Sequence, residues 1–128
     1  MSIKDSLRIL VVDDMAISRS LITQALDEIG IRHYRTENDG ARAFQSLATQ
    51  PVHLVISDLN MPGMDGLQLL EAIRTHKETA RTGFVLVTGR ADAKTLGRGQ
   101  KLAMNNYLQK PFDTPKMKKC IETVVGRL

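Results

Sequence analysis

The sequence predicts an α/β fold: a single doubly wound parallel sheet of five strands with helices on both faces. Short apolar runs alternate five times with segments in which apolar residues recur at helical spacing. The connections between these segments are short, and this combination favours crossovers that place helices on both sides of one parallel sheet. A chain of 128 residues has the length of one domain.

The first part of the chain contains three strand–helix units. Residues 7–12 form a nearly continuous apolar run, which is typical of a strand buried on both faces. A weaker strand is expected at 32–36 and a third at 52–56. Gly30 stands where a C-cap glycine belongs, so the first helix is expected to end there. The three helical stripes consist of Leu21, Ile22, Ala25, Leu26 and Ile29, then Gly40, Ala43, Phe44, Leu47 and Ala48, then Leu69, Leu70 and Ile73.

The remaining part contains two strands, at 84–87 and 107–109, and two helices. The helix expected at 91–103 has a thin apolar stripe and contains Gly97 and Gly99, each of which costs ~1 kcal/mol relative to Ala. Cys120 lies on the apolar face of the last helix and is the only cysteine, so we expect a buried thiol and a reducing compartment. The stripe of that helix consists of Met117, Cys120, Ile121, Val124, Val125 and Leu128.

The composition is that of an ordinary soluble globular protein, with 42% hydrophobic and 25% charged residues. Lys4, Asp5 and Arg8 interrupt the start of the chain, and the apolar run that follows is too short for a secretory signal. No stretch reaches the apolar length of a membrane span. We therefore expect a cytoplasmic protein without a membrane partner. The formal net charge of +4 suits either an acidic partner surface or simple solubility.

Polar residues follow four of the five expected strands. Asp13 and Asp14 follow the first strand, Asp58 the third, Thr88 the fourth and Lys110 the fifth. The carboxyl ends of parallel strands share one edge of a sheet, where α/β proteins bind their ligands. Any one of these residues alone would indicate only a turn or a helix cap. Their combination predicts one functional site.

Three aspartates at one sheet edge predict a cation site. Each close pair of carboxylates costs about 4 kcal/mol at an effective dielectric constant of about 20, so either a proton is retained or a cation binds. Oxygen ligands without His or Cys favour Mg²⁺ over Zn²⁺, and three Asp, one Lys and one Mg²⁺ sum to zero charge. A carboxylate in such a site can attack a phosphoryl donor and form an aspartyl-phosphate.

Four motifs give the chain a resemblance to the response-regulator receiver family. They are VVDDM at 11–15, DLNMPGMDG at 58–66, VTG at 87–89 and YLQKPF at 107–112. The resemblance covers essentially the whole chain and is strongest to the CheY-like, single-domain chemotaxis regulators. It implies the strand order 2-1-3-4-5 and one receiver domain over residues 1–128 without an output domain.

The resemblance also implies roles for the residues at the strand ends. Asp58 would accept the phosphoryl group, Asp14 would bind Mg²⁺ directly, and Asp13 would support the metal through water. Asp58 and the backbone carbonyl of Asn60 would be further metal ligands. Lys110 would pair with the phosphoryl group, and its peptide bond to Pro111 is expected to be cis.

Two residues are implied to form the conformational switch. Thr88 would move toward the phosphoryl group, and Tyr107 would rotate inward with it. Asn60 and Arg90 occupy positions that tune the phosphate lifetime in this family. The cationic Arg90 either lies near the phosphoryl oxygens or points to solvent.

The chain departs from the family pattern in the helix at 91–103. Gly97 and Gly99 weaken that helix, and Ala103 stands where the family commonly has Gly. We therefore expect this segment to become ordered on phosphorylation or binding. The usual partner surface of the family would be basic here through Lys94, Arg98, Lys101, Lys116, Lys118 and Lys119, although a solvated helix surface explains these residues nearly as well.

The implied function is a phosphorylation-activated signalling switch rather than an enzyme, limited to self-phosphorylation and slow autodephosphorylation. Its expected partners are a CheA-like sensor histidine kinase and a downstream protein such as the flagellar motor switch, and we expect a monomer. A phosphate sink or relay intermediate without an output target fits the sequence equally well. A phosphohydrolase that uses an aspartyl-phosphate normally carries its nucleophile in an Asp-x-Asp motif after the first strand, whereas Asp13 and Asp14 are adjacent here. The sequence contains no P-loop and no nucleic-acid-binding motif.

Overall fold

Five strands form one parallel sheet in the order β2-β1-β3-β4-β5 in the computed structural model, which describes residues 3–128. The strands are β1 (Arg8–Val12), β2 (His33–Glu37), β3 (Leu54–Asp58), β4 (Gly83–Thr88) and β5 (Asn106–Gln109). Each strand runs parallel to its neighbours. The predicted fold class and strand order are confirmed.

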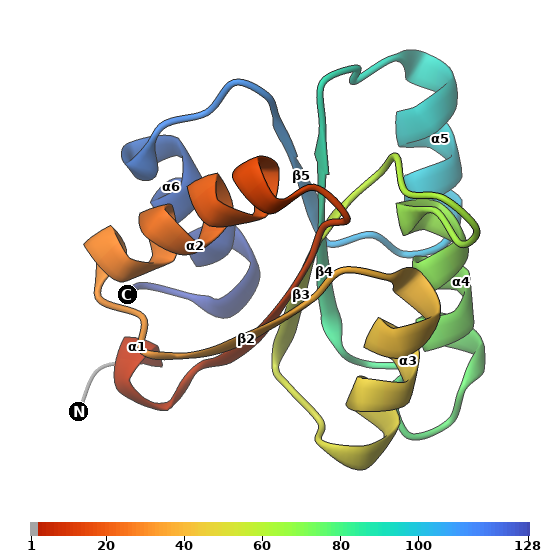
Figure 1. Cartoon of the computed structure of the whole chain (residues 1–128), viewed down its shortest axis with the longest axis horizontal. Helices are drawn as coiled ribbons and strands as arrows, with labels where there is room; N and C mark the ends of the chain where they lie inside the picture. Colours follow the sequence, from red (N-terminus) through yellow and green to blue (C-terminus); the bar gives the residue numbers. More distant parts are fainter. Residues whose placement is uncertain (1–2) are drawn as a thin grey trace.

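Helices cover both faces of the sheet (Figure 1). On one face lie α2 (Ala16–Ile29) and α6 (Thr114–Val125), and on the other lie α3 (Gly40–Thr49), α4 (Gly66–Thr75) and α5 (Ala93–Lys101). A further turn of helix, α1 (Ile3–Ser6), precedes β1 and was not predicted. Four residues are too few to show a helical period, so no sequence pattern could reveal α1.

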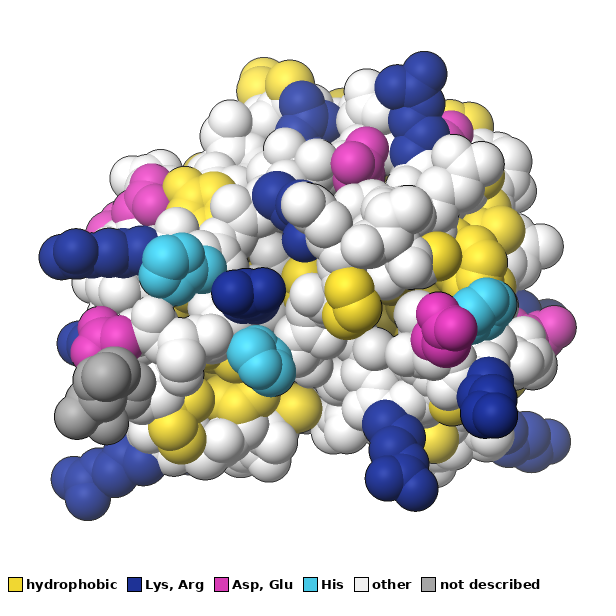
Figure 2. Space-filling view, turned by 90° about the horizontal axis from the view of Figure 1, so that it is seen from below, with side chains coloured by type: hydrophobic (Ala, Val, Ile, Leu, Met, Phe, Trp, Pro, Cys, Tyr) yellow, Lys and Arg dark blue, Asp and Glu magenta, His cyan; other side chains and the backbone are white. Residues whose placement is uncertain are grey.

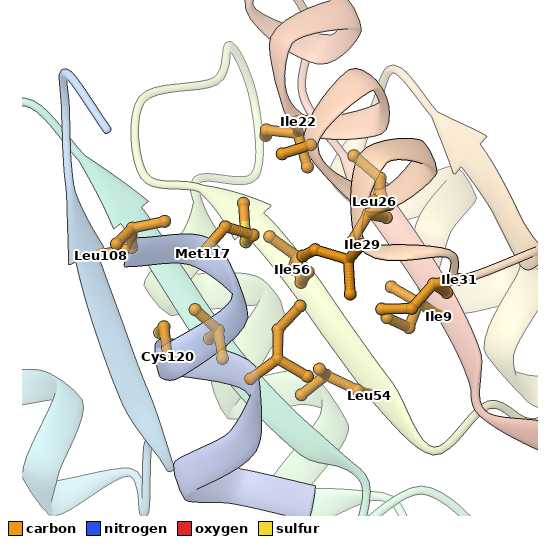
Figure 3. Packing of buried hydrophobic residues seen from close by; sticks show 14 of the residues in the cluster. Ile9, Ile22, Leu26, Ile29, Ile31, Leu54, Ile56, Leu108, Met117 and Cys120 are labelled. Carbon is orange, nitrogen blue, oxygen red and sulfur yellow. The ribbon is translucent and has the colours of Figure 1, made fainter. Parts of the chain in front are cut away.

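The sheet separates two hydrophobic clusters, and alternate residues of a strand contribute to each. In β1, Ile9 and Val11 belong to the cluster beneath α2 and α6, whereas Leu10 and Val12 belong to the opposite cluster. Side chains of a strand alternate between its faces, so a strand covered on both sides reads as a continuous apolar run. Figure 3 shows Ile22 and Leu26 of α2 and Met117 of α6 around Ile56 in the first cluster.

Cys120 is buried in the same cluster, as predicted (Figure 3). Burial raises the pKa of its thiol to about 11, because the thiolate would lose its hydration there. The neutral thiol therefore acts as a small apolar side chain in the core.

The predicted helical stripes are wrong at three positions. Leu21 is 56% exposed because α2 turns the neighbouring Ile22 toward the sheet. Ala48 is exposed for the same reason beside the buried Leu47. Leu128 lies beyond the end of α6, because the chain leaves the helix at Gly126 with a φ of 99°.

The segment expected at 91–103 does contain a helix, and α5 is weakly packed. Asp92 caps its first turn by accepting a hydrogen bond from the Thr95 amide at 2.8 Å. Gly99 is its only buried residue. Ala103 has a φ of 60°, a conformation that favours glycine, and the Arg74 guanidinium donates two hydrogen bonds to its carbonyl. Whether α5 becomes more ordered on phosphorylation stays a prediction. No helix among residues 3–128 is long and apolar enough to cross a membrane.

Two glycines provide a matched test of the packing behind β3. A Cβ on Gly66, at the start of α4, would overlap the Asp58 carbonyl and lie 3.0 Å from the Cα of Leu59, whereas a Cβ on Gly97 would meet nothing within 4 Å. We predict that Gly66→Ala lowers the free energy of unfolding by ~1–3 kcal/mol through overpacking. Gly97→Ala should raise it by ~1 kcal/mol through helix propensity. Urea unfolding of both variants measures these changes, and an unchanged midpoint for Gly66→Ala would contradict the packing described here.

Candidate functional site

The structure brings Asp13, Asp14, Asp58 and Lys110 together at the carboxyl edge of the sheet. Asp13 directly follows β1, Asp58 is the last residue of β3, and Lys110 directly follows β5. One carboxylate oxygen from each aspartate lies within 4.8 Å of the others. Thr88 ends β4 one residue beyond Val87, the register partner of Asp58. Strands β1, β3 and β4 are adjacent in the sheet, and this adjacency concentrates the polar residues in one place.

The three carboxylates are poorly compensated by the residues around them. Asp13 is fully buried, Asp58 is 7% exposed, and Asp14 is partly buried. Asp13 Oδ2 and Asp14 Oδ1 are buried and have no hydrogen-bond partner among the described residues. Buried carboxylate oxygens without partners are costly, and a divalent cation would supply the missing interaction. The donor set consists of hard oxygens, so the residues present fit Mg²⁺ or a similar ion.

Backbone and side-chain contacts hold Asp13 in place. Its Oδ1 accepts a hydrogen bond from the Met15 amide at 3.0 Å, and its carbonyl accepts one from the Arg19 guanidinium at 2.8 Å. Because a carboxylate is rigid and planar, the bond to Oδ1 also fixes the direction of Oδ2, the oxygen without a hydrogen-bond partner among the described residues. Sequence reasoning missed Arg19, because an arginine on a helix gives no sign that it reaches back to the preceding strand end.

Lys110 is the only cation that pairs with the aspartates among the described residues. Its Nζ donates to Asp58 Oδ1 at 2.9 Å and to Ser18 Oγ at 2.8 Å, and it lies 4.0 Å from Asp13 Oδ2. The Lys110–Pro111 peptide bond is cis, as expected. Ser18 was not predicted as part of the site, since a serine on a helix after an Asp-Asp pair reads as an ordinary surface residue.

Burial and charge act in opposite directions on Asp58. Burial is the largest effect and raises the pKa of its carboxyl group, because the ionised form loses hydration. The hydrogen bond and positive charge of Lys110 lower this pKa, whereas the charges of Asp13 and Asp14 raise it. The net pKa of Asp58 is raised. A cation bound beside the carboxylate would lower this pKa and keep Asp58 ionised for attack on an electrophile.

The Thr88 side chain is buried, and its hydroxyl is already engaged in hydrogen bonds. Its hydroxyl accepts a hydrogen bond from the Arg90 amide at 3.0 Å and donates to the Arg90 carbonyl at 3.1 Å. Tyr107, on the next strand, is 39% exposed. The side chains of Asn60 and Arg90 are exposed, and within residues 3–128 no hydrogen bond or ion pair joins them to Asp13, Asp14 or Asp58, so their influence on phosphate lifetime stays a prediction.

Six exposed lysine and arginine residues lie on α5 and α6, the helices that precede and follow β5 in the chain. We use the name α5–α6 surface for Lys94, Arg98, Lys101, Lys116, Lys118 and Lys119 together with Tyr107. A groove of about 620 Å³ beside β5 is lined by Tyr107, Lys116 and Lys119. Lys and Arg side chains are also spread across the face of the molecule shown in Figure 2, so positive charge is not confined to the α5–α6 surface.

Curated relatives resemble the chain over its whole length. The probable chemotaxis protein CheY of Rhizobium etli is 41% identical over 128 residues, which are 100% of this chain and 99% of that protein. The chemotaxis protein CheY of Pseudomonas aeruginosa is 30% identical over 122 residues, which are 95% of this chain and 98% of that protein.

Solved structures share the fold. Chemotaxis protein CheY4 of Vibrio cholerae has a TM-score of 0.86 at 25% identity, covering 92% of this chain and 98% of that one. The receiver domain of a sensor histidine kinase from Pseudomonas aeruginosa, with a magnesium ion coordinated in its active-site cleft, has a TM-score of 0.84 at 25% identity, covering 94% and 98%.

The model of the response regulator receiver domain family matches residues 9–122, which include every residue of the aspartate cluster and Lys110. The match, the relatives and the geometry agree. The chain therefore belongs to the response regulator receiver family, as a CheY-like receiver domain.

Proposed function

We propose that this protein is a phosphorylation-activated switch in two-component signalling, in which Asp58 takes a phosphoryl group from a histidine kinase. One observation carries the proposal. The Lys110 ammonium lies 2.9 Å from Asp58 Oδ1, beside two buried carboxylate oxygens that have no hydrogen-bond partner. Phosphoryl transfer to an aspartate requires a nucleophilic carboxylate beside a cationic side chain and a pair of carboxylates that can bind a metal ion.

In the transfer, a carboxylate oxygen of Asp58 forms a bond to phosphorus while the phosphorus–nitrogen bond of a phosphohistidine breaks. The electron pair of that bond returns to the imidazole nitrogen, which takes up a proton. Lys110 already binds Oδ1, so Oδ2 is the oxygen that we assign as the nucleophile. The Lys110 ammonium is close enough to pass to an incoming phosphoryl oxygen and offset its charge.

Asp13, Asp14, Asp58 and the backbone carbonyl of Asn60 are the residues that would hold Mg²⁺. When bound, Mg²⁺ supplies positive charge that offsets the phosphoryl oxygens and the mutual repulsion of the carboxylates. Slow hydrolysis of the acyl phosphate returns the protein to its resting state, so its own chemistry is limited to self-modification.

Phosphorylation of Asp58 is directly testable with a small donor. We expect acetyl phosphate and Mg²⁺ to add one phosphoryl group to the parent protein, with release of acetate, because the acyl phosphate reacts as phosphohistidine does. Asp58→Asn should show no addition by intact-mass spectrometry, and chelation of Mg²⁺ should abolish addition to the parent. Asp39→Asn, which changes only the partly exposed N-cap of α3, is the matched control and should react normally. Equal phosphorylation of Asp58→Asn and the parent would overturn the proposal.

The switch is proposed to run through Thr88. A phosphoryl group carries a charge near −2 and attracts hydrogen-bond donors. The Thr88 hydroxyl can donate to the phosphoryl group only if it breaks its hydrogen bond to the Arg90 carbonyl. The loop after β4 would then lose one of its anchors, and Tyr107 on the neighbouring strand could turn inward.

A tryptophan at position 107 can report this movement, because the chain contains no other. We predict that Mg²⁺ and beryllofluoride change the fluorescence of Tyr107→Trp, as the indole leaves water. The change should disappear when Thr88→Val is added, since valine has no hydroxyl, and persist with Thr88→Ser. A full change in the Thr88→Val background would rule out this route.

The output is proposed to be a protein bound by the α5–α6 surface, with the flagellar motor switch as the leading target given the relatives named for chemotaxis. Exposed lysines and arginines on that surface would attract an acidic partner. The alternative is a phosphate sink, which would need only the kinase.

Partner capture separates the two roles. We expect immobilised protein activated with beryllofluoride to retain a motor-switch component from cells of the source organism, and the unactivated protein not to retain it. Activation would expose or order the binding surface, which explains the difference. Asp58→Asn, which lacks the acceptor carboxylate, serves as the control. Retention of a histidine kinase alone would support the sink and count against the motor output.

A further inference from the structure

Ser18 contacts the lysine of the site from a helix far away in the sequence. It lies near the start of α2, and its Oγ accepts a hydrogen bond from Lys110 Nζ at 2.8 Å across 92 residues of chain. The same ammonium donates to Asp58 Oδ1 at 2.9 Å. Ser18, Lys110 and Asp58 therefore form a continuous hydrogen-bonded row that links α2 to the end of β3.

Among the described residues, the Ser18 hydroxyl binds Lys110 and not the backbone of its own helix. Serine within a helix commonly donates to the carbonyl three or four residues earlier. Thr49 and Thr75 do so in this chain, whereas Lys110 is the one hydrogen-bond partner of the Ser18 side chain among residues 3–128. Ser18 is also half-buried, so water competes less with the bond than it would at an exposed position.

Lys110 needs such a contact because its side chain is long and mobile. Ordering a lysine side chain costs up to about 2 kcal/mol of conformational entropy. Of its possible acceptors, Asp13 Oδ2 at 4.0 Å is too distant for a hydrogen bond. Lys110 also borders a groove of about 580 Å³ that Ser18, Leu21 and Phe112 line, so its side chain has open space beside it. Ser18 is the one neutral side chain among residues 3–128 that accepts a hydrogen bond from its ammonium.

We propose that Ser18 is a positioning residue for phosphoryl transfer, whose hydroxyl holds the Lys110 ammonium against the acceptor carboxylate of Asp58. The inference rests on the proposed function, since it assigns Ser18 a part in that same reaction. The hydroxyl is neutral, and its one hydrogen bond among the described residues is to Lys110 rather than to a carboxylate, so it stays bound to Lys110 while the ammonium passes from Asp58 Oδ1 to a phosphoryl oxygen. The bond to Ser18 therefore limits the positions that the ammonium can occupy while it exchanges one acceptor for the other.

Removing the hydroxyl tests the idea. We expect Ser18→Ala to slow phosphorylation by acetyl phosphate about tenfold, the size of one hydrogen bond to a charged group. Ser18→Thr keeps a hydroxyl and should recover most of the rate. Ser20→Ala, an exposed serine two residues along the same helix, is the matched control and should react like the parent.

A double-mutant cycle distinguishes positioning from a general effect on folding. In a Lys110→Met background, Ser18→Ala should cause no further loss of rate, because the group that it positions is gone. A tenfold loss in that background as well would overturn the proposal.

A second readout requires neither metal nor phosphodonor. In nitrogen-15 NMR spectra of the metal-free protein, we expect Ser18→Ala to accelerate hydrogen exchange of the Lys110 ammonium about tenfold, whereas Ser20→Ala should leave it unchanged. Unchanged exchange and an unchanged phosphorylation rate in Ser18→Ala would overturn the role of Ser18 alone. Phosphorylation that persists in Asp58→Asn would instead overturn the function on which it rests.

Discussion

Repulsion among Asp13, Asp14 and Asp58 is the constraint on which the rest of the site depends. Three carboxylates share a space in which one oxygen of each lies within 4.8 Å of the others. Only a rigid frame can hold them there, because each would otherwise turn toward water. The frame is the parallel sheet, whose central strands β1 and β3 are packed by hydrophobic clusters on both faces. Core packing offsets the electrostatic cost at the sheet edge.

A single lysine compensates part of this charge, and its position is a consequence of the fold. β5 ends at the same edge as β3, although β4 lies between them in the sheet. Lys110 therefore has to reach past β4 to Asp58, and its long stem makes this possible. A long side chain is also mobile. The hydrogen bonds of the Lys110 ammonium to Asp58 and Ser18 therefore matter, because they fix the position of the positive charge in the site.

Local patterns in the sequence predicted the fold and the aspartate cluster because both follow from rules that act within short segments. Apolar runs mark buried strands, and parallel strands gather their carboxyl ends at one edge. Ser18 and Arg19 escaped prediction because each acts through one long-range or backward contact of its side chain. Leu21 was misplaced for a related reason: two adjacent apolar residues on a helix do not reveal which of them faces the sheet.

The weak packing of α5 explains how a change of charge at Asp58 could reach the protein surface. The Thr88 hydroxyl fastens the start of the loop that leads into α5 through its two bonds to Arg90. Within α5 itself only Gly99 is buried, so little apolar surface opposes a shift of this helix. The helices α2 and α4, by contrast, each bury at least four residues against the sheet. A disturbance at Thr88 is therefore expected to move α5 before any other element, and α5 carries half of the charged residues of the α5–α6 surface.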